Sequence, residues 1–562
     1  MASNPLPVVY DPENAALPDA SREMSFGGAV EGAERLKRET VNWNPSRVSP
    51  DRAINTIRTE ADARSRDMMM NDGYTQGVVR LQKDSIIGGV FRLNAKPDYR
   101  TIYGKDTAAA AEYGEELAAI AESRFNLAAE SEDCWFDAAG MNTFTGLLRL
   151  QVGAYLYTGD CFETVEWQDS DTQRPFKTNF QLVAPQRVNN PDGRDDEAGL
   201  RRGIEIDGRG RPKAFWVQDG YTNDFYAGEY GTRWKRVPER KPWGRRQVLF
   251  MRDTSLIDQT RGMSEMVAAL AHMRMTKKFS EITLQRAVVD ATYAAAIESE
   301  LPNPEIVAAM GGGQDGWTSA IGSYMGMLQE YLGGSENIQI DGVQMPHLFP
   351  GTKLNLQGVS APAGVGSDFE ASQMRRIAAT LGVSYAELTR DFTKGSYSSA
   401  KAEVALAERT ATVKKKVCAE RLATQRYQLW FEEEMAAGNL PLPPGKNRTD
   451  FYRPMMKDAY TRCSWIGTGR GQIDELKETQ AAMLRIKAGL STFEEECAKL
   501  GRDYREVFAQ RAKEDKHQKK LGLTFTLDAT KQGGGEAGKT IGQKDPNQQD
   551  DNNQQDTDDG EE

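Results

Sequence analysis

Two unusually long segments with a helical pattern constrain this chain more than any other feature. They cover residues 264–300 and 399–437. The first ends at Pro302 and Pro304, which cannot continue a helix, and the second ends at Gly438. At 1.5 Å per residue the first would extend roughly 55 Å, well beyond an ordinary globular helix. Such helices need neighbours that bury their apolar faces, so we expect an elongated molecule or one stabilised by other subunits.

The rest of the chain mixes shorter helices with strands. Apolar residues at helical spacing predict helices over 52–66, 73–87, 113–126 and 142–157, with a strand over 90–95. Residues 159–250 alternate in the manner of strands, and Asp207-Gly208 predicts a hairpin turn. Further helices are expected over 368–381, 473–488 and 504–519. The pattern is α+β and predominantly helical, without repeated βαβ units.

Charge is distributed unevenly along the 562 residues, which carry a net charge of -11. The segment 528–562 holds ten acidic and three basic residues, a net of -7, so the remainder carries only -4. Its Gly, Gln, Asn and Asp composition predicts disorder from about residue 526 onward. A nearly balanced body lacks the basic excess of a tight nucleic-acid binder, so any DNA contact should be loose or confined to a small basic feature.

Catalytic and metal-binding patterns are missing from the sequence. The three histidines and five cysteines are scattered, without CxxC or HExxH spacing, so we expect no metal, no cofactor and no catalytic residue. The cysteines are expected to be small buried apolar residues. No apolar run approaches the 18 or so residues that span a bilayer, and the first residues do not form a signal peptide. We therefore expect neither a membrane partner nor secretion.

Three charged or glycine-rich runs suggest chemistry that the surrounding sequence does not support. Gly533–Thr540 fits the phosphate-loop pattern GxxxxGK[ST], but no strand precedes it and no helix follows it, so a linker is favoured. Glu432–Glu434 is expected on a solvated helix face. Lys414–Lys416 is expected on a solvated face too, with contact to a polyanion as the alternative.

The segment Thr389–Ser399 has neither a helical nor a strand period and precedes the second long helix. It mixes charges, aromatic rings and small residues. One interpretation is an exposed connection between helices. The other is a loop that rigid helices project into a shared space, where Arg390 and Lys394 would meet phosphate.

Several extended segments follow one another in a characteristic order. They are RDMMMNDGYTQGVVRLQKDSIIGGVFRL (66–93), QTRGMSEMVAALAHMRM (259–275), AIESEL (296–301), PHLFPGTKLNLQ (346–357), IAATLGVSYAELTRDFTKGSYSSAKA (377–402), WIGTGRGQIDELKETQAAM (465–483) and AGLSTFEEECAKLGRDYREVFAQ (488–510). In these segments the chain resembles the lambda-type family of phage portal proteins. The resemblance covers most of the chain, from about Trp43 to Lys519.

This resemblance implies a portal fold with wing, stem, clip and crown parts, assembled as a ring. The order of segments then maps as follows: N-terminal arm 1–42, wing 43–262, first stem helix 263–300, clip 301–360, second stem helix 361–383, tunnel loop 384–398, long wing helix and its return 399–454, crown helices 455–525, acidic tail 526–562.

The resemblance also implies a non-enzymatic function. Twelve subunits would form the channel through which DNA enters and leaves the head, at one capsid vertex of a virion assembled in the bacterial cytoplasm. Implied partners are double-stranded DNA without sequence preference, the large terminase subunit, the major capsid and scaffold proteins, and a head–tail adaptor. The implied channel residues are Arg390, Asp391, Phe392, Lys394 and Tyr397. The implied partner-binding residues of the clip are Gly311, Gly312, Gly313, Trp317, Met325 and Met327.

Two other functions remain open on the sequence. An ATPase motor would rest on Gly533–Thr540, and an internal scaffold or adaptor would bind capsid protein without forming a channel.

Overall fold

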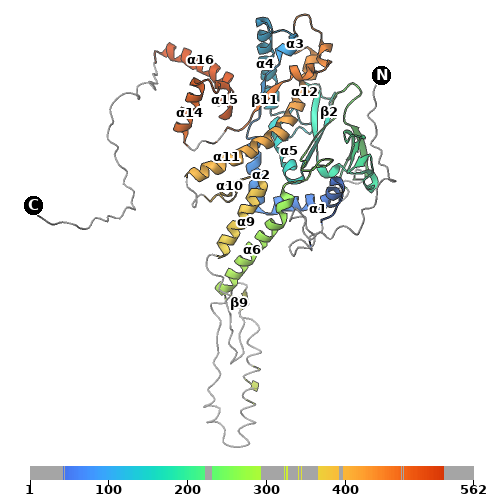
Figure 1. The fold of residues 1–562 in the computed structure, drawn as a ribbon, viewed down its shortest axis with the longest axis vertical. Coiled ribbons are helices and arrows are strands. Elements are labelled where there is room, and N and C mark those ends of the chain that lie inside the picture. The colour runs from blue at the N-terminus through green and yellow to red at the C-terminus, as the bar shows by residue number, and fades with distance from the viewer. Residues whose placement is uncertain are drawn as a thin grey trace, which may run out of the picture. The chain divides into compact units, whose positions relative to one another are not determined.

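The computed structural model describes residues 42, 45–221, 224, 231–292, 322, 325–326, 329, 339–340, 343–344, 365–391, 397–469, 471 and 474–523. The chain divides into two compact units, 1–501 and 502–562, and each is described by itself. Figure 1 labels the elements in chain order.

The first unit begins with two helices joined by a single residue. α1 (Pro50–Asn71) is capped by the Ser49 side chain, and α2 (Gly73–Ile86) by Asp72, whose carboxylate accepts from the Thr75 amide. Both confirm the helices predicted over 52–66 and 73–87. The next helices, α3 (Tyr99–Tyr103), α4 (Ala108–Ala129) and α5 (Phe144–Thr158), follow a short strand, β1 (Arg92–Ala95).

Two antiparallel sheets occupy the strand-rich segment. One has the order β3-β2-β8 and the other β4-β5-β6-β7. Their strands are β2 (Asp160–Trp167), β3 (Thr178–Val183), β4 (Leu200–Arg201), β5 (Ile204–Ile206), β6 (Pro212–Gln218), β7 (Trp234–Pro238) and β8 (Val248–Arg252). The predicted turn after Asp207 joins β5 to β6. The two sheets enclose a small core of their own around Phe162, Phe215 and Val248.

The large core joins parts of the chain that lie far apart in sequence. β1 pairs antiparallel with β11 (Cys463–Ile466), with Leu93 opposite Trp465. The Trp465 ring stacks on Phe91 and Phe144, and meets Phe125 edge to face. Residues 463–466 therefore belong to the same core as the helices of 50–158. Their assignment to the crown, which the resemblance implied, stays a prediction.

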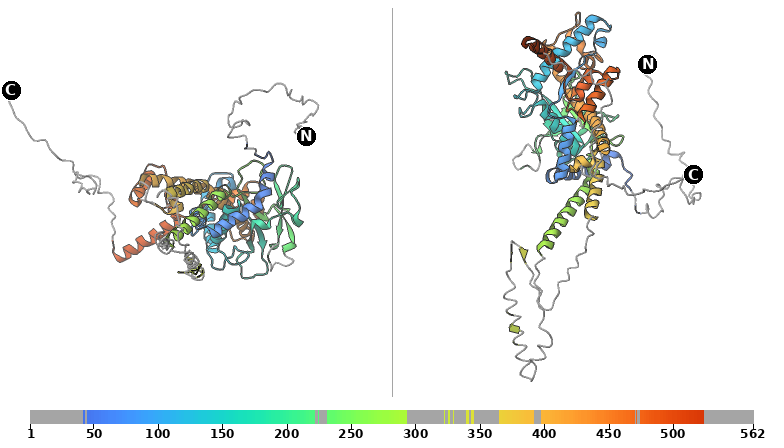
Figure 2. Two further views of the ribbon diagram at one scale, coloured as in Figure 1. Left: turned by 90° about the horizontal axis from the view of Figure 1, so that it is seen from below. Right: turned by 90° about the vertical axis from the view of Figure 1, so that its left-hand side faces the viewer.

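Long helices lie beside this body (Figures 1 and 2). α6 (Met266–Thr292) and α9 (Val365–Leu381) pack side by side, and α10 (Tyr385–Thr389) follows α9. α11 (Tyr397–Lys414), a π-helical turn (Lys415–Ala419) and α12 (Glu420–Ala437) together confirm the predicted helix over 399–437. The predicted end of the first long helix, residues 293–300, lies outside the described residues.

Small elements complete the two units. Two-residue strands β9 (Gln339–Ile340) and β10 (Val343–Gln344) pair with each other. The first unit ends with α13 (Met456–Tyr460), α14 (Glu475–Lys487) and α15 (Phe493–Lys499). The second contains α16 (Tyr504–Leu521), capped by Asp503. The α+β, predominantly helical fold class is confirmed.

Two charged runs differ from expectation. Glu432 and Glu434 are buried, where Glu432 meets Lys457 and Arg245, and Glu434 meets Arg124. The prediction of a solvated glutamate face was wrong, because this helix is covered by neighbours on nearly all sides.

The side chains of the basic run Lys414–Lys416 also differ from one another in burial. Lys414 is buried against Glu265, and Lys415 donates to the Trp465 carbonyl, while Lys416 is exposed. It is not a continuous basic face.

Of the five cysteines, Cys134, Cys161 and Cys418 are buried and the other two are half-buried. None of them forms a disulfide, which agrees with the expected small apolar role.

Candidate functional site

The segment between α9 and α11 begins with the short helix α10. Ser384 and Glu387 form a capping box, in which the Ser384 hydroxyl accepts from the Glu387 amide and the Glu387 carboxylate from the Ser384 amide. α10 ends at Arg390, which adopts the left-handed conformation with φ of 59°. Sequence reasoning treated 384–398 as loop throughout, although the capping box was visible in the letters SYAE.

α10 is held firmly against the body. Leu388 is buried, and the Arg375 guanidinium of α9 lies 5.0 Å from the centre of the Tyr385 ring. Upstream, the Gln82 side chain of α2 donates to the Leu381 carbonyl at 2.6 Å, which fixes the end of α9. A surface groove of about 610 Å³ runs between these elements, and Arg390 contributes to its wall. The start of the predicted channel segment is thus rigidly positioned.

Of the predicted channel residues, the structure brings Arg390 and Asp391 together at the end of α10. The Arg390 side chain is exposed, and the Asp391 amide donates to the Thr389 hydroxyl at 3.3 Å. Tyr397 begins α11, with its side chain outside the described residues. Phe392 and Lys394 also lie outside them.

Of the predicted clip residues, only Met325 is described. It is helical and 61% exposed. Gly311, Gly312, Gly313, Trp317 and Met327 lie outside the described residues.

Within the described residues, α6 and α9 pack against each other near their base. There the rings of Phe279 and Phe369 meet with centroids 5.5 Å apart, and His272 Nδ1 lies 3.2 Å from the Gln373 side-chain oxygen. Farther along α6 every described side chain from 281 to 288 is exposed, including Ile282 and Leu284 at 52% and 67%. This part of the helix therefore presents apolar surface at Ile282 and Leu284.

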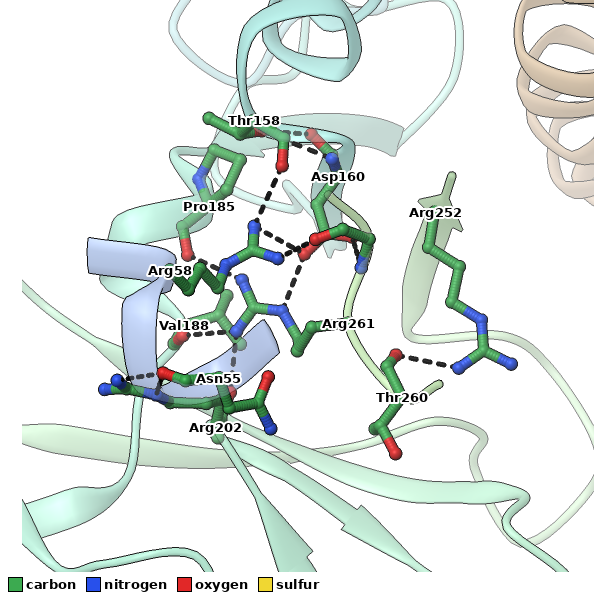
Figure 3. Close-up of polar contacts among 12 residues, drawn as sticks. Asn55, Arg58, Thr158, Asp160, Pro185, Val188, Arg202, Arg252, Thr260 and Arg261 are labelled. Carbon is green, nitrogen blue, oxygen red and sulfur yellow. Dashed lines mark hydrogen bonds and ion pairs between the residues drawn. The ribbon is translucent and has the colours of Figure 1, made fainter. Parts of the chain in front are cut away.

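A buried polar cluster anchors the start of α6, and its geometry is drawn in Figure 3. Arg261 is 1% exposed and donates from Nε to Asp160 at 2.6 Å. Its remaining nitrogens donate to backbone carbonyls of Pro185, Val188 and Arg202, at 2.6–3.0 Å. One side chain therefore ties the connector before α6 to β2 and to the loops of the second sheet.

Arg58 of α1 enters the same cluster from the other side. Its guanidinium lies 2.9 Å from Asp160 and donates to the Gly262 and Thr158 carbonyls. Asp160 also accepts from the Gly262 amide at 2.6 Å. Gly262 is required here, because an added Cβ would lie 1.9 Å from the Gly159 carbonyl oxygen.

The charges of this cluster shift one another. Burial raises the pKa of Asp62 to about 6, against the attraction of Arg58 at 3.4 Å. Burial and the neighbouring Arg58 lower the pKa of Arg261 to about 10, so it stays charged near neutral pH. The cluster is thus a desolvated network of alternating charges, in which each guanidinium has a carboxylate partner.

A second contact fixes the same connector. The Asp51 carboxylate at the start of α1 accepts from the Thr260 amide and hydroxyl, both at 2.7 Å. Sequence reasoning did not single out Arg58, Asp160 or Arg261. They stand among other charged residues without a distinguishing pattern, and folding alone brings together positions about 100 and 200 residues apart.

The described part of the chain offers no group of three or more His, Cys, Asp or Glu side chains placed to hold a metal ion. Among its helices, none is long and apolar enough to cross a bilayer.

The chain is similar to known phage proteins over nearly its full length. It is 34% identical over 508 residues to the portal protein of Escherichia phage N15, covering 89% of this chain and 90% of that one. It is 33% identical over 509 residues to portal protein B of Escherichia phage lambda, covering 90% and 93%.

Solved neck and virion structures of gene transfer agent particles also match. One, the neck of a native particle computed with C12 symmetry, covers 80% of this chain and 99% of the matched chain at 13% identity, with a TM-score of 0.33.

The family model described as phage portal protein, lambda family, matches residues 36–414, two thirds of the chain. With the two relatives above, this match confirms the resemblance found in the sequence. The chain belongs to the lambda family of phage portal proteins.

Proposed function

We propose that copies of this chain close into a ring, expected to hold twelve subunits, which conducts duplex DNA into the capsid and out of it. The observation that carries this proposal is the exposed outer half of α6. A helix with Ile282 and Leu284 open to water is poorly stabilised by its own chain, because each such side chain gains about 1.5–3 kcal/mol on full burial. Identical neighbours in a closed ring would supply that burial.

The channel lining is assigned to the segment that follows α9. α10 is fixed by its capping box and by the buried Leu388, so Arg390 projects from a rigid base. A few cations can centre a duplex through its phosphates without reading bases. Phe392 and Tyr397 would narrow the opening, Arg390 and Lys394 would meet phosphate, and Asp391 would limit the attraction.

Weak attraction suits such a channel. Every favourable phosphate contact must be broken as the duplex moves, so a strongly basic lining would slow translocation. The near-balanced charge of residues 1–527 supports a conduit that holds DNA loosely. ATP hydrolysis would then reside in a separate terminase, and the clip, including Met325, would dock that terminase and later the head–tail adaptor. The capsid and scaffold proteins would surround the ring at one vertex of the virion.

Electron microscopy of the purified full-length protein tests the ring. We expect closed rings with a central opening, and double substitution of Ile282 and Leu284 by Ser should shift the population toward smaller species. The matched control is Leu127→Ser on α4, whose side chain is 78% exposed on the body. Globular monomers at high protein concentration would contradict the proposal.

Deleting residues 390–396 tests the channel segment separately. Rings should still form, because α10 and α11 retain their packing. DNA packaging, measured as nuclease-protected DNA in filled heads, should fall strongly. Normal packaging by the deletion variant would refute the assignment of this segment while leaving the ring intact.

A further inference from the structure

The basic charge of this acidic chain gathers in the second sheet and its turns. Residues 209–246 contain ten basic and four acidic residues, a net of +6, whereas the whole chain carries -11. This segment forms β6, β7 and the turns beside them. It lies apart from α9, α10 and α11 in the sequence and does not contribute to the groove beside Arg390.

Within this segment three arginines share one carboxylate. Glu239 lies 3.5 Å from Arg211, 3.3 Å from Arg240 and 3.5 Å from Arg246. These are long separations for ion pairs that involve guanidinium groups, whose hydrogen bonds to carboxylates are normally 2.7–2.9 Å. The cluster therefore holds two positive charges more than its single carboxylate balances.

The crowding has an electrostatic consequence. Partial burial and the repulsion of Arg240, Arg421 and Arg211 lower the pKa of Arg246, against the attraction of Glu239. The buried Arg240 Nε atom lies 3.3 Å from Glu239 Oε1, but the contact does not have the geometry of a hydrogen bond. By contrast, the nearby Arg236 makes two short bonds to Glu205, of 2.8 and 2.6 Å. A further anion bound at the three-arginine cluster would reduce the repulsion between these guanidinium groups.

The cluster is also accessible. The Arg211 side chain is 64% exposed, and those of Arg240 and Arg246 are 34% and 31% exposed. Exposed cations lie beside it: Lys213 on β6 and Arg421 at the start of α12. The Asp207 carboxylate is attracted by Lys213 and Arg211, and the Glu205 carboxylate by Lys213, although neither forms an ion pair with Lys213 within the described residues. This basic cluster (Arg211, Lys213, Arg240, Arg246 and Arg421) therefore keeps an excess of positive charge over the carboxylates around it.

We propose that the basic cluster binds the phosphodiester backbone of duplex DNA, at a site separate from the channel segment. Guanidinium groups suit phosphate oxygens because their N–H donors form a planar fork. One large apolar side chain, Trp243, is exposed in the turn between Arg240 and Arg246. Nucleic acid is favoured over an acidic protein because the five cations outnumber this single apolar side chain, whereas a protein interface has an apolar centre depleted of charge. The choice of DNA as the polyanion rests on the proposed function, which brings a duplex to this protein.

Covalently closed circular duplex distinguishes this site from the channel. A circle cannot thread a ring that has already closed, so its binding reports surfaces outside the opening. Preassembled rings should retain relaxed circular DNA in a filter assay at 50 mM salt. The variant with Arg211, Arg240 and Arg421 each replaced by Glu should bind at least about tenfold more weakly, and the slope of log affinity against log salt should shrink by about 2–3.

Two matched variants sharpen the result. Reversing Arg100 and Arg453 to Glu, two equally exposed arginines that pair with Asp106 and Asp450, should change binding less than twofold. Glu239→Gln removes the competing carboxylate and should tighten binding severalfold, a gain that a merely structural role would not produce. If the triple reversal fails to fold, the neutral pair Arg211→Gln and Arg240→Gln replaces it, with a loss of about threefold expected.

Three outcomes would overturn the site. The first is unchanged binding of circles by the triple or the neutral variant. The second is displacement of circles by polyglutamate as effectively as by linear duplex at equal charge, which would assign the cluster to an acidic protein. The third is weaker binding by Glu239→Gln. Rings that fail to retain circles but still package DNA would refute this site alone, whereas absence of rings would refute the proposed function alone.

Discussion

Arg261 and Asp160 form an ion pair of 2.6 Å in which both side chains are almost completely buried. The pair joins the connector before α6 to the first residue of β2. Arg58 of α1 reaches the same carboxylate, so three elements meet at one group. The position at which α6 leaves the body therefore depends on a desolvated electrostatic contact as well as on the apolar packing of Met266, Ala269 and Met273.

Replacing Arg261 by Met should destabilise the protein by about 3–5 kcal/mol, because Asp160 would lose one of its two guanidinium partners and three backbone carbonyls would lose their donor. The measurement is the urea midpoint, with an unchanged slope that indicates a folded native state. Arg100→Met provides the control, since Arg100 and Asp106 are both more than half exposed and such pairs contribute at most about 1 kcal/mol. Equal effects of the two substitutions would contradict the role of the buried pair.

Asp62 should make the protein less stable as pH rises from about 4 to about 6. Its folded pKa, near 6, lies above the ordinary value of 3.8, so the folded state binds more protons in this window. Protonation is therefore stabilising, and ionisation above pH 6 costs on the order of 3 kcal/mol.

Asp62→Asn should remove this pH dependence and leave the protein at least as stable as the parent at pH 8. Thermal unfolding from pH 4 to 8 measures the difference. A variant that is less stable than the parent at pH 8, and no less stable at pH 4, would show that the attraction of Arg58 outweighs burial.

Gly262→Ala should displace the start of α6. The new methyl group would lie 1.9 Å from the Gly159 carbonyl oxygen, a backbone atom that accepts from the Asp253 amide at 2.7 Å. We expect a stability loss of several kcal/mol, as for other severe overpacking, and reduced ring formation. Gly77→Ala on α2 meets nothing within 4 Å and should instead stabilise by about 0.4–1 kcal/mol. A tolerated Gly262→Ala would indicate a looser connector.

Deleting Lys416 should convert the π-helical turn Lys415–Ala419 into regular α-helix. A π-helical turn holds one residue more than the α-helical turn that would replace it, so α11 and α12 should keep nearly the same orientation. Lys414 should then keep Glu265, now 2.6 Å away, and we expect a loss of at most about 1 kcal/mol. Lys416→Ala should cost less than about 0.5 kcal/mol, because this side chain is 78% exposed. A loss of several kcal/mol in calorimetry of the deletion variant would show that the turn itself sets the position of α11.

The periodicity of the sequence predicted the described parts of both long helices, because each has an apolar stripe at helical spacing, and Gly438 marks the end of the second. It also placed the strand alternation and the turn at Asp207 correctly. It did not predict the π-helical turn, because the residues of such a turn show the same local sequence pattern as a continuous α-helix. Nor did it predict α10, where a five-residue helix is too short for periodicity and only the capping box marks it.

Side-chain burial was the harder problem. Glu432 and Glu434 look like a solvated run, but Lys457, Arg245 and Arg124 arrive from distant segments and pair with them. The Arg58–Asp160–Arg261 cluster was missed for the same reason, since tertiary structure alone brings its members together. The resemblance assigned Arg390 and Asp391 to the channel segment, and their function there stays a prediction.

The pairing of β1 with β11 joins positions about 370 residues apart. A nascent chain on the ribosome therefore cannot complete its large core until Trp465 has emerged, and Phe91, Phe125 and Phe144 stay without their last partner during most of synthesis. Prematurely terminated chains that stop before residue 463 would expose this aromatic surface to chaperones and proteases. An incomplete polypeptide would therefore lack the strand that completes the large core, and we expect it to be degraded before it can assemble.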